Sequence, residues 1–300
     1  MKLKPVYREL GPNALARRAG KAYRQLRECR LCGHCCGVDR LSGRTGICRA
    51  GKTVLISGYG PHFGEEQPLV GRYGSGTVFF SFCNLQCVFC QNYEISAEAE
   101  GDQRSLPQLA RIMLTLQQRR CHNINLVSPS HYVPQILGAL YLASRQGLSV
   151  PIVYNTGGYD ALDTLRLLDG IIDIYMPDIK FLQPDSARRL AGARGYPETV
   201  KQALVEMQRQ VGDLTLDNQG VAVRGILVRH LVLPGNLAYT EAVLDFLASE
   251  VSPNCLVNIM DQYHPAYRAA EFPPLNRRPT RSEITEAINM AQERGLRVYS

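Results

Sequence analysis

Three cysteines stand close together at Cys83, Cys87 and Cys90, in the spacing C-x3-C-x2-C. Cysteine thiolates hold iron–sulfur clusters, and a [4Fe–4S] cluster normally takes one thiolate for each of its four irons. A group of only three cysteines leaves one iron without a protein ligand. Because an open coordination position is where a metal centre meets its substrate, this spacing predicts a reactive [4Fe–4S] cluster. A disulfide or a zinc knuckle is the alternative, but no fourth ligand is evident nearby.

The aromatic residue Phe89 directly precedes the last cysteine, and with it the motif resembles the signature of the radical SAM superfamily. The resemblance implies that S-adenosylmethionine (SAM) chelates the open iron through its amino and carboxylate groups. One electron from a reducing partner, such as a flavodoxin or ferredoxin-like protein, would then cleave SAM and release a 5′-deoxyadenosyl radical. The chain is therefore expected to be an enzyme.

A second group of cysteines precedes this motif, in a segment whose glycines suit tight turns around an ion. Four of them are candidate ligands of a second metal, either zinc or an auxiliary iron–sulfur cluster: Cys29, Cys32, Cys36 and Cys48. Cys35 and His34 compete for the same role. The N-terminus lacks the apolar core of a signal peptide, so a reducing compartment is expected. There the ten cysteines are better explained by metal binding than by disulfides.

From residue 77 onward, short apolar runs alternate with helical patterns, which favours a parallel sheet covered by helices. Six such units predict an α/β fold of the partial (β/α)6 TIM-barrel type, with a Cys-rich N-terminal extension. The expected strands cover residues 77–82, 123–128, 150–155, 171–177, 224–232 and 255–260. The expected helices cover 106–119, 132–146, 160–169, 198–210 and 239–250, and a last helix begins at the capping box 280–283.

Two regions follow from this pattern: residues 1–56, a basic helix with the Cys-rich metal-binding extension, and residues 57–300, the partial barrel. The segment 57–76 between them is rich in Gly and Pro and is expected to be a loop with little regular structure. His62 in that loop is expected to be solvated. Residues 214–223 are expected to form a hairpin or a loop insertion.

The net charge of +7 is concentrated in residues 1–30. An apolar stripe at helical spacing (Leu15, Ala19, Ala22 and Leu26) favours a solvated amphipathic helix there. The alternative from another functional class is a non-catalytic metal-binding protein that contacts nucleic acid through this basic leader. The rest of the chain lacks an evident basic groove, so no nucleic-acid partner is expected. No apolar run approaches the roughly 20 residues of a membrane helix, so we expect a cytoplasmic protein without a membrane partner.

Polar residues follow every predicted strand, at the carboxyl ends where a parallel α/β barrel carries its active site. Lys180 and Arg229 are suited to bind the carboxylate of SAM. Short polar side chains at other strand ends are further candidate contacts: Ser128, Ser130, Asn155 and Thr156.

From about residue 77 to residue 265 the chain resembles the pyruvate formate-lyase activating enzyme group. Three segments carry the resemblance: Asn155-Thr156-Gly157-Gly158, Asp178-Ile179-Lys180, and the strand from Arg229 to Gly235. It implies a monovalent cation near SAM, held by positions that match Asn155, Thr156, Met176 and Asp178, and a late histidine, His264, near the nucleoside. With its N-terminal cysteines, nearly the whole chain resembles the PflX-like branch.

The sequence departs from that group at two positions. Ser128-Pro129-Ser130-His131 replaces the Gly-Gly-Glu-Pro motif that meets the SAM amino group, and Asn155 stands where an aspartate is expected. The candidate SAM-binding residues are therefore Phe89, Ser128, Ser130, His131, Asn155, Thr156, Asp178, Lys180, Arg229 and His264. The implied reaction is hydrogen abstraction from a glycine of a partner protein. A small molecule, a peptide or RNA is the alternative substrate.

Overall fold

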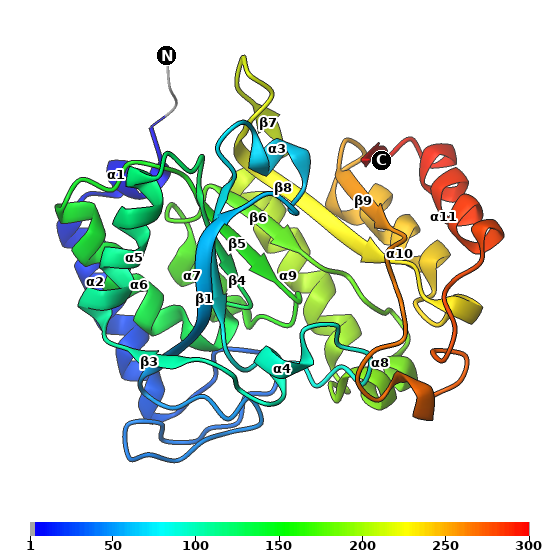
Figure 1. Ribbon diagram of the computed structural model, residues 1–300, viewed down its shortest axis with the longest axis horizontal. Coiled ribbons are helices and arrows are strands. Elements are labelled where there is room, and N and C mark those ends of the chain that lie inside the picture. The colour runs from blue at the N-terminus through cyan, green and yellow to red at the C-terminus, as the bar shows by residue number, and fades with distance from the viewer. Residues whose placement is uncertain (1–3, 300) are drawn as a thin grey trace.

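The computed structural model describes residues 4–299 as strands alternating with helices (Figure 1). The strands are β1 (Val54–His62), β2 (Ser75–Phe80), β3 (Asp102–Arg104), β4 (Ile124–Val127), β5 (Ile152–Thr156), β6 (Ile174–Pro177), β7 (Thr215–Leu216), β8 (Ala222–Leu231), β9 (Leu256–Met260) and β10 (Arg297–Tyr299). The α-helices are α1 (Val6–Leu10), α2 (Pro12–Arg24), α3 (Gln67–Val70), α4 (Tyr93–Ser96), α5 (Leu106–Gln118), α6 (Val133–Arg145), α7 (Leu162–Leu168), α8 (Pro184–Ala191), α9 (Tyr196–Val211), α10 (Thr240–Phe246) and α11 (Arg281–Glu293).

One sheet organises these elements, with the strand order β10-β9-β8-β6-β5-β4-β2-β1-β3 and with β7 paired to β8. The neighbours from β2 to β10 are all parallel, whereas β1 pairs antiparallel with both β2 and β3. The order is linear, so the sheet curves without closing. This architecture confirms the predicted α/β fold of the partial TIM-barrel type.

The predicted strands and helices beyond residue 77 are all present, with ends that differ by a few residues. The parallel strands were readable because most of them are buried on both faces; every residue of β5 is buried. The helix expected over 239–250 is α10 followed by a π-helical turn, Leu247–Val251. The last helix begins at the predicted capping box, in which Thr280 and Glu283 cap one another. The hairpin expected over 214–223 is the antiparallel pair of β7 and β8.

The prediction that residues 57–76 form an irregular loop is wrong, because this segment contains most of β1, all of α3 and the start of β2. The first residues of β1, Val54 to Ile56, pair with β3, whereas the part from Gly58 to His62 pairs only with β2. A strand with one unpaired side tolerates a proline such as Pro61, which has no N–H to donate. The Gly and Pro residues of this segment therefore led to the prediction of a loop where β1, a strand with one partly unpaired side, is present.

The N-terminal helix α2 packs its apolar stripe inward, as the sequence predicts. Leu15 and Ala22 are fully buried, and Ala19 packs against the same core. Leu26, in the 3-10 turn that follows α2, is buried in a separate cluster with Cys29 and Leu31. On another face of the helix, the Arg18 guanidinium donates hydrogen bonds to main-chain carbonyls at the end of α7. The division expected at residue 56 falls inside β1, so the extension continues directly into the sheet.

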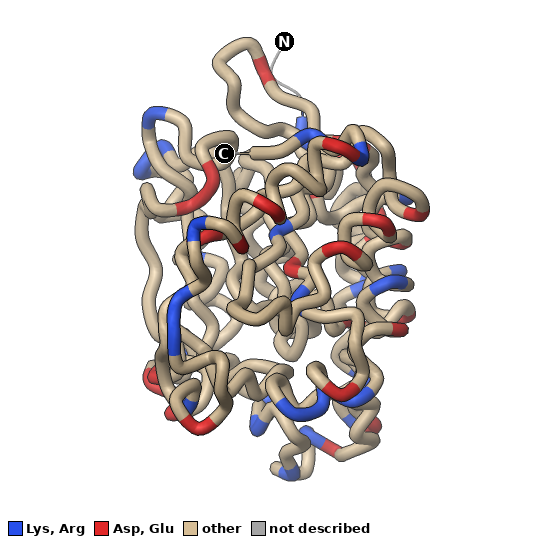
Figure 2. The backbone as a smooth tube through the Cα atoms, turned by 90° about the vertical axis from the view of Figure 1, so that its right-hand side faces the viewer, with Lys and Arg blue, Asp and Glu red and all other residues tan. Residues whose placement is uncertain are grey.

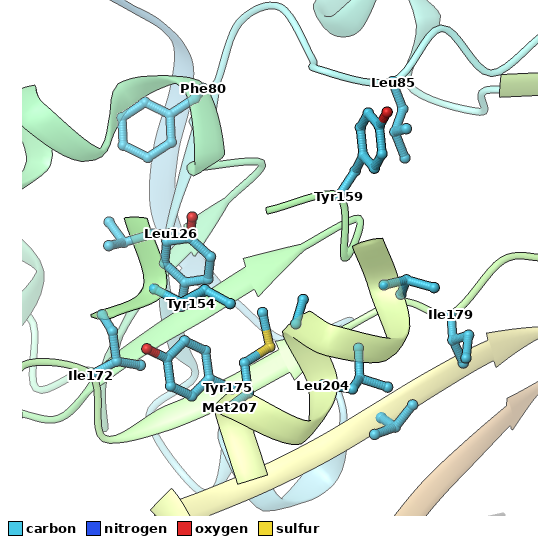
Figure 3. Close-up of a cluster of buried hydrophobic side chains, with 14 of the residues drawn as sticks. Phe80, Leu85, Leu126, Tyr154, Tyr159, Ile172, Tyr175, Ile179, Leu204 and Met207 are labelled. Atoms are coloured by element: carbon cyan, nitrogen blue, oxygen red, sulfur yellow. The ribbon is translucent and has the colours of Figure 1, made fainter. Parts of the chain in front are cut away.

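A layer of buried side chains joins the middle strands to the helix α9 (Figure 3). Tyr154 of β5 and Tyr175 of β6 pack edge to face, with ring centroids 5.7 Å apart. Leu204 and Met207 of α9 lie in the same cluster, and the Tyr175 hydroxyl donates to Gln210 Oε1 at 2.7 Å. This packing fixes the middle strands, so their carboxyl ends are held at one edge of the sheet.

Within residues 4–299, no helix combines the length and the apolar character needed to cross a membrane. On the face shown in Figure 2, acidic and basic residues are interspersed.

Candidate active site

The loop after β2 carries Cys83, Cys87 and Cys90, which are all half-buried. Its main chain is fixed between the cysteines, because the N–H groups of Gln86 and Val88 each donate to a carbonyl in the last turn of α8 at 2.9 Å. These two hydrogen bonds hold the loop against the end of α8.

The pKa values of the Cys83 and Cys87 thiols are shifted by burial and by the same neighbouring charges. Burial raises the pKa of Cys83 to about 11, and burial likewise raises the pKa of Cys87 above its ordinary value. A charge on Cys90 adds to both effects, whereas Lys180 opposes them. The Cys83 sulfur also accepts a hydrogen bond from the Leu85 N–H at 3.3 Å. Bound metal deprotonates a thiol, and hydrogen bonds to sulfur stabilise the resulting thiolate, so these residues fit an iron–sulfur cluster.

Within residues 4–299, no three His, Cys, Asp or Glu side chains converge on a point where they would hold one metal ion.

Asp178, just after β6, lies between two basic side chains. Its Oδ2 accepts from Lys180 Nζ at 2.6 Å, and its Oδ1 accepts from Arg229 Nε at 2.8 Å. Burial alone would raise the pKa of Asp178, but Arg229 and Lys180 together hold that pKa below its ordinary value. Arg229 also donates to Asn155 Oδ1 at 2.7 Å. The structure therefore brings together four of the predicted residues, from the ends of three strands.

Glu66 belongs to the same network and was not predicted. Its Oε1 lies 3.9 Å from Arg229 and accepts a hydrogen bond from Asn258 of β9 at 3.0 Å, while its Oε2 is buried without a hydrogen-bond partner. The neighbouring Glu65 meets His62 at 3.0 Å, so His62 is not simply solvated. Burial raises the pKa of Glu65, and Arg229 opposes that rise. In the sequence, Glu65 and Glu66 stand out only as two adjacent carboxylates, which are common on protein surfaces and do not indicate a site.

Ser130 and Thr156 form a separate buried group around Asp160. The Thr156 hydroxyl lies 3.1 Å from the Ser130 hydroxyl and donates to Asp160 at 2.6 Å. The Tyr154 hydroxyl donates to the other oxygen of Asp160 at 2.8 Å. Burial raises the pKa of Asp160, and these hydrogen bonds limit the rise. Here Thr156 and Ser130 face a buried carboxylate, and Asp160 was not among the predicted site residues.

Ser128 and His131 follow β4 but lie in different surroundings. Ser128 adopts a left-handed backbone conformation with φ of 56°, and its N–H donates to the main-chain oxygen of Asn155 at 2.9 Å. His131 is buried, and its Nε2 lies 3.0 Å from the Ser81 carbonyl oxygen. Burial lowers the pKa of His131 to about 3. His131 lines the same small void as the N-terminal cysteines.

Phe89 and His264 both lie beside the Cys83–Cys90 loop. Phe89 is buried edge-on against Phe181 and Tyr263, at centroid distances of 6.0 and 6.1 Å. His264 is exposed, and its Nδ1 accepts from the side chain of Gln91, the residue after Cys90, at 3.1 Å. Phe89 therefore packs on the buried side of the loop, whereas His264 lies on its solvent-exposed side.

The N-terminal cysteines pack directly beside this loop. His34 Nε2 lies 2.8 Å from the Asn84 main-chain oxygen, and the Asn84 side chain donates to the Tyr159 carbonyl at 2.8 Å. A charge on Cys48 is near enough to influence the thiol of Cys83. Two groups of cysteines that are separate in the sequence thus become neighbours.

Comparison with known proteins agrees with this arrangement. The sequence pattern that defines the Radical SAM superfamily matches residues 77–218, which include the three-cysteine loop and the strands from β2 to β6. The uncharacterized protein MJ0674 of Methanocaldococcus jannaschii is 31% identical over 292 residues, which are 95% of this chain and 80% of that protein.

Among solved structures, the crystal structure of a radical SAM methyltransferase from Sphaerobacter thermophilus has a similar fold, with a TM-score of 0.52 and 15% sequence identity. The similarity covers 74% of this chain and 65% of that enzyme, so about a third of the enzyme lies outside the shared fold.

Proposed function

Because this chain belongs to the radical SAM superfamily, we propose that Cys83, Cys87 and Cys90 hold its [4Fe–4S] cluster and that SAM binds beside them, at the strand ends. The chain is accordingly an enzyme with that cluster and SAM as cofactors. When bound and reduced by one electron from an external donor, the cluster would cleave SAM to methionine and a 5′-deoxyadenosyl radical that can take a hydrogen atom from a substrate. The observation that carries the proposal is the loop after β2, where three half-buried thiols share their surroundings with Lys180.

The side chains at the strand ends then have different roles. The Lys180 side chain is 18% exposed, and its Nζ contacts the carboxylate of Asp178, so Nζ can donate its other hydrogens to the carboxylate of SAM. Arg229 is committed to Asp178 and Asn155, and holds both in place. The Arg229 guanidinium donates to the side-chain oxygens of Asp178 and Asn155. The resemblance to the activating enzymes assigns these two positions to a monovalent cation. We propose that Arg229 supplies the positive charge at that position.

The cleavage of SAM is tested directly. Anaerobically reconstituted protein, with a one-electron reductant and SAM, is expected to form 5′-deoxyadenosine, measured by liquid chromatography and mass spectrometry. The Cys83→Ala variant should form none above background, because the cluster loses a ligand. Cys255→Ser is the matched control, because Cys255 is also a buried cysteine but lies beside β9, and four strands separate β9 from β2 in the sheet.

Equal product from the wild type and from Cys83→Ala would exclude the proposed site. No product from either, in protein that holds its iron, would favour the non-catalytic alternative. That alternative also requires salt-dependent nucleic-acid binding that survives the loss of all three cysteines.

For the substrate, we propose a glycine in a polypeptide, because the segments around Asp178 and Arg229 resemble those of the pyruvate formate-lyase activating enzyme group. Glycine-containing peptides labelled with deuterium at the α-carbon are incubated with the enzyme, reductant and SAM. Deuterium is expected in 5′-deoxyadenosine, because the radical abstracts that atom. Deuterium taken only from labelled small molecules or RNA would assign one of the alternative substrates.

A further inference from the structure

The N-terminal cysteines enclose a small void of about 10 Å³. The cysteines, a buried arginine and a buried histidine line it: Cys29, Cys32, Cys35, Cys36, Cys48, Arg40 and His131. The chain folds tightly over it, since a Cβ added at Gly46 would lie 2.7 Å from the Cys36 sulfur. Glycine at this position lets the main chain approach the sulfur closely.

The structure separates four of these cysteines from the fifth. Cys32 and Cys48 each lie within electrostatic reach of both Cys29 and Cys36, so the four thiols form one group. Cys35 borders the void too, but it is exposed, and its thiol donates to the Cys32 carbonyl at 3.4 Å. The group is therefore a set of four, the number of thiolates that an iron–sulfur cluster or a tetrahedral ion takes.

Arg40 places a buried positive charge beside this group. Its side chain is fully buried and donates to the carbonyls of Gly51 and His131 and, at 3.9 Å, to the Cys29 sulfur. In the described part of the chain it forms no ion pair with a carboxylate. A buried guanidinium without a counter-charge is strongly unfavourable. Metal-bound cysteines are thiolates, and they would supply that charge.

His131 provides a second, independent sign of a ligand. Its Nε2 faces the Ser81 carbonyl, which can only accept, so the hydrogen of the neutral ring is on Nε2. Among the described residues, the buried Nδ1 has no hydrogen-bond partner, and His131 is one of the residues that line the void. When one nitrogen of a neutral imidazole donates a hydrogen bond, the other nitrogen keeps a lone pair that can face a metal centre.

Zinc has no redox chemistry, whereas an iron–sulfur cluster could exchange electrons with a cluster in the neighbouring three-cysteine loop. The position of this group of cysteines therefore favours a cluster over a single ion.

We propose that Cys29, Cys32, Cys36 and Cys48 bind an auxiliary iron–sulfur cluster, with His131 facing it and Arg40 balancing its charge. The cluster would lie next to the three-cysteine loop, because Cys48 is within electrostatic reach of Cys83 and His34 bonds to the main chain of Asn84. It is thus placed to pass one electron from an external reductant to the neighbouring [4Fe–4S] cluster. The assignment of the cluster itself does not depend on SAM cleavage.

The test uses the full chain with Cys83, Cys87 and Cys90 all changed to Ala, so that only the N-terminal group can hold a cluster. Iron, zinc and acid-labile sulfide are measured per chain after anaerobic reconstitution, and electron paramagnetic resonance is recorded after reduction. Iron and sulfide are expected in equal amounts, about four of each or about two of each, with a cluster signal. Stoichiometric zinc, iron without sulfide, or no metal at all would overturn the proposal.

Two further variants of that protein locate the cluster. Adding Cys29→Ser and Cys48→Ser should remove the remaining iron and sulfide, whereas adding Cys35→Ser should leave both in place. Circular dichroism checks that each variant is folded. If Cys35→Ser removes as much iron as the double change does, the set of four ligands is wrong. A failed 5′-deoxyadenosine assay would leave this result untouched, so the two proposals fail separately.

Discussion

At the scale of single residues, Asp178 links the two basic side chains of the site. It accepts hydrogen bonds from Lys180 at 2.6 Å and from Arg229 at 2.8 Å, and its side chain is only 14% exposed. Removing one partner of a buried ion pair leaves an uncompensated charge behind. Here two cations would lose their shared carboxylate at once, so Asp178 both stabilises the fold and orients the residues proposed to receive SAM.

We expect Asp178→Asn to lower the free energy of unfolding by about 3 kcal/mol, because the amide cannot balance two buried cations. Urea denaturation measures this change as a shift of the midpoint at constant slope. Asp185→Asn is the matched control, because Asp185 pairs with Arg188 on an exposed face of α8 and its side chain is 83% exposed. The control should cost less than about 1 kcal/mol. Equal effects of the two changes would contradict the role given to Asp178.

At the scale of elements, Asp173 joins the N-terminal extension to the barrel. It precedes β6, and its two carboxylate oxygens accept from the N–H of Val6 at 2.9 Å and from the N–H of Ile152 at 2.8 Å. One side chain thus fixes the start of α1 against the starts of β5 and β6. Burial raises the pKa of Asp173 to about 7, although both hydrogen bonds oppose that rise.

This pKa predicts how the stability of the protein depends on pH. Between the ordinary aspartate pKa of about 4 and a folded-state pKa of about 7, the folded chain binds a proton that the unfolded chain releases. The free energy of unfolding should therefore fall as the pH rises through this range, by up to about 1.4 kcal/mol per unit, and level off above it.

Asp173→Asn has no charge to titrate, so the wild type should lose stability relative to this variant between pH 4 and pH 7. Urea denaturation at a series of pH values in one buffer system measures the difference. A wild type that gains stability relative to the variant over that range would show that the two N–H donors outweigh burial.

At the scale of the whole molecule, the sequence predicted most of the parallel sheet, because buried strands such as β5 read as continuous apolar runs between helical patterns. It failed at residues 57–76, where Gly and Pro masked β1 and α3. The three-cysteine motif was evident because its ligands are adjacent in the chain. Glu66 was not evident, because its partners Arg229 and Asn258 are distant in sequence and meet it only in the folded barrel.

The same limit applies to Ser130 and Thr156. Their position at strand ends was predicted correctly, but the direction of their side chains depends on Asp160, which binds Thr156 inside the protein. Strand ends can be located from an apolar pattern, whereas the face that a side chain takes depends on contacts with other elements.

The open sheet has one more consequence, which concerns aggregation. The strand order of the open sheet ends at β3 and β10, and the part of β1 from Gly58 to His62 is also unpaired on one side. Unpaired strand edges invite pairing with other molecules. Both edge strands are only three residues long, and they carry charged side chains, Asp102 and Arg104 in β3 and Arg297 in β10. Short, charged edges offer little to a second copy of the chain. The two ends of the open sheet are therefore poorly suited to pairing with another copy of the chain.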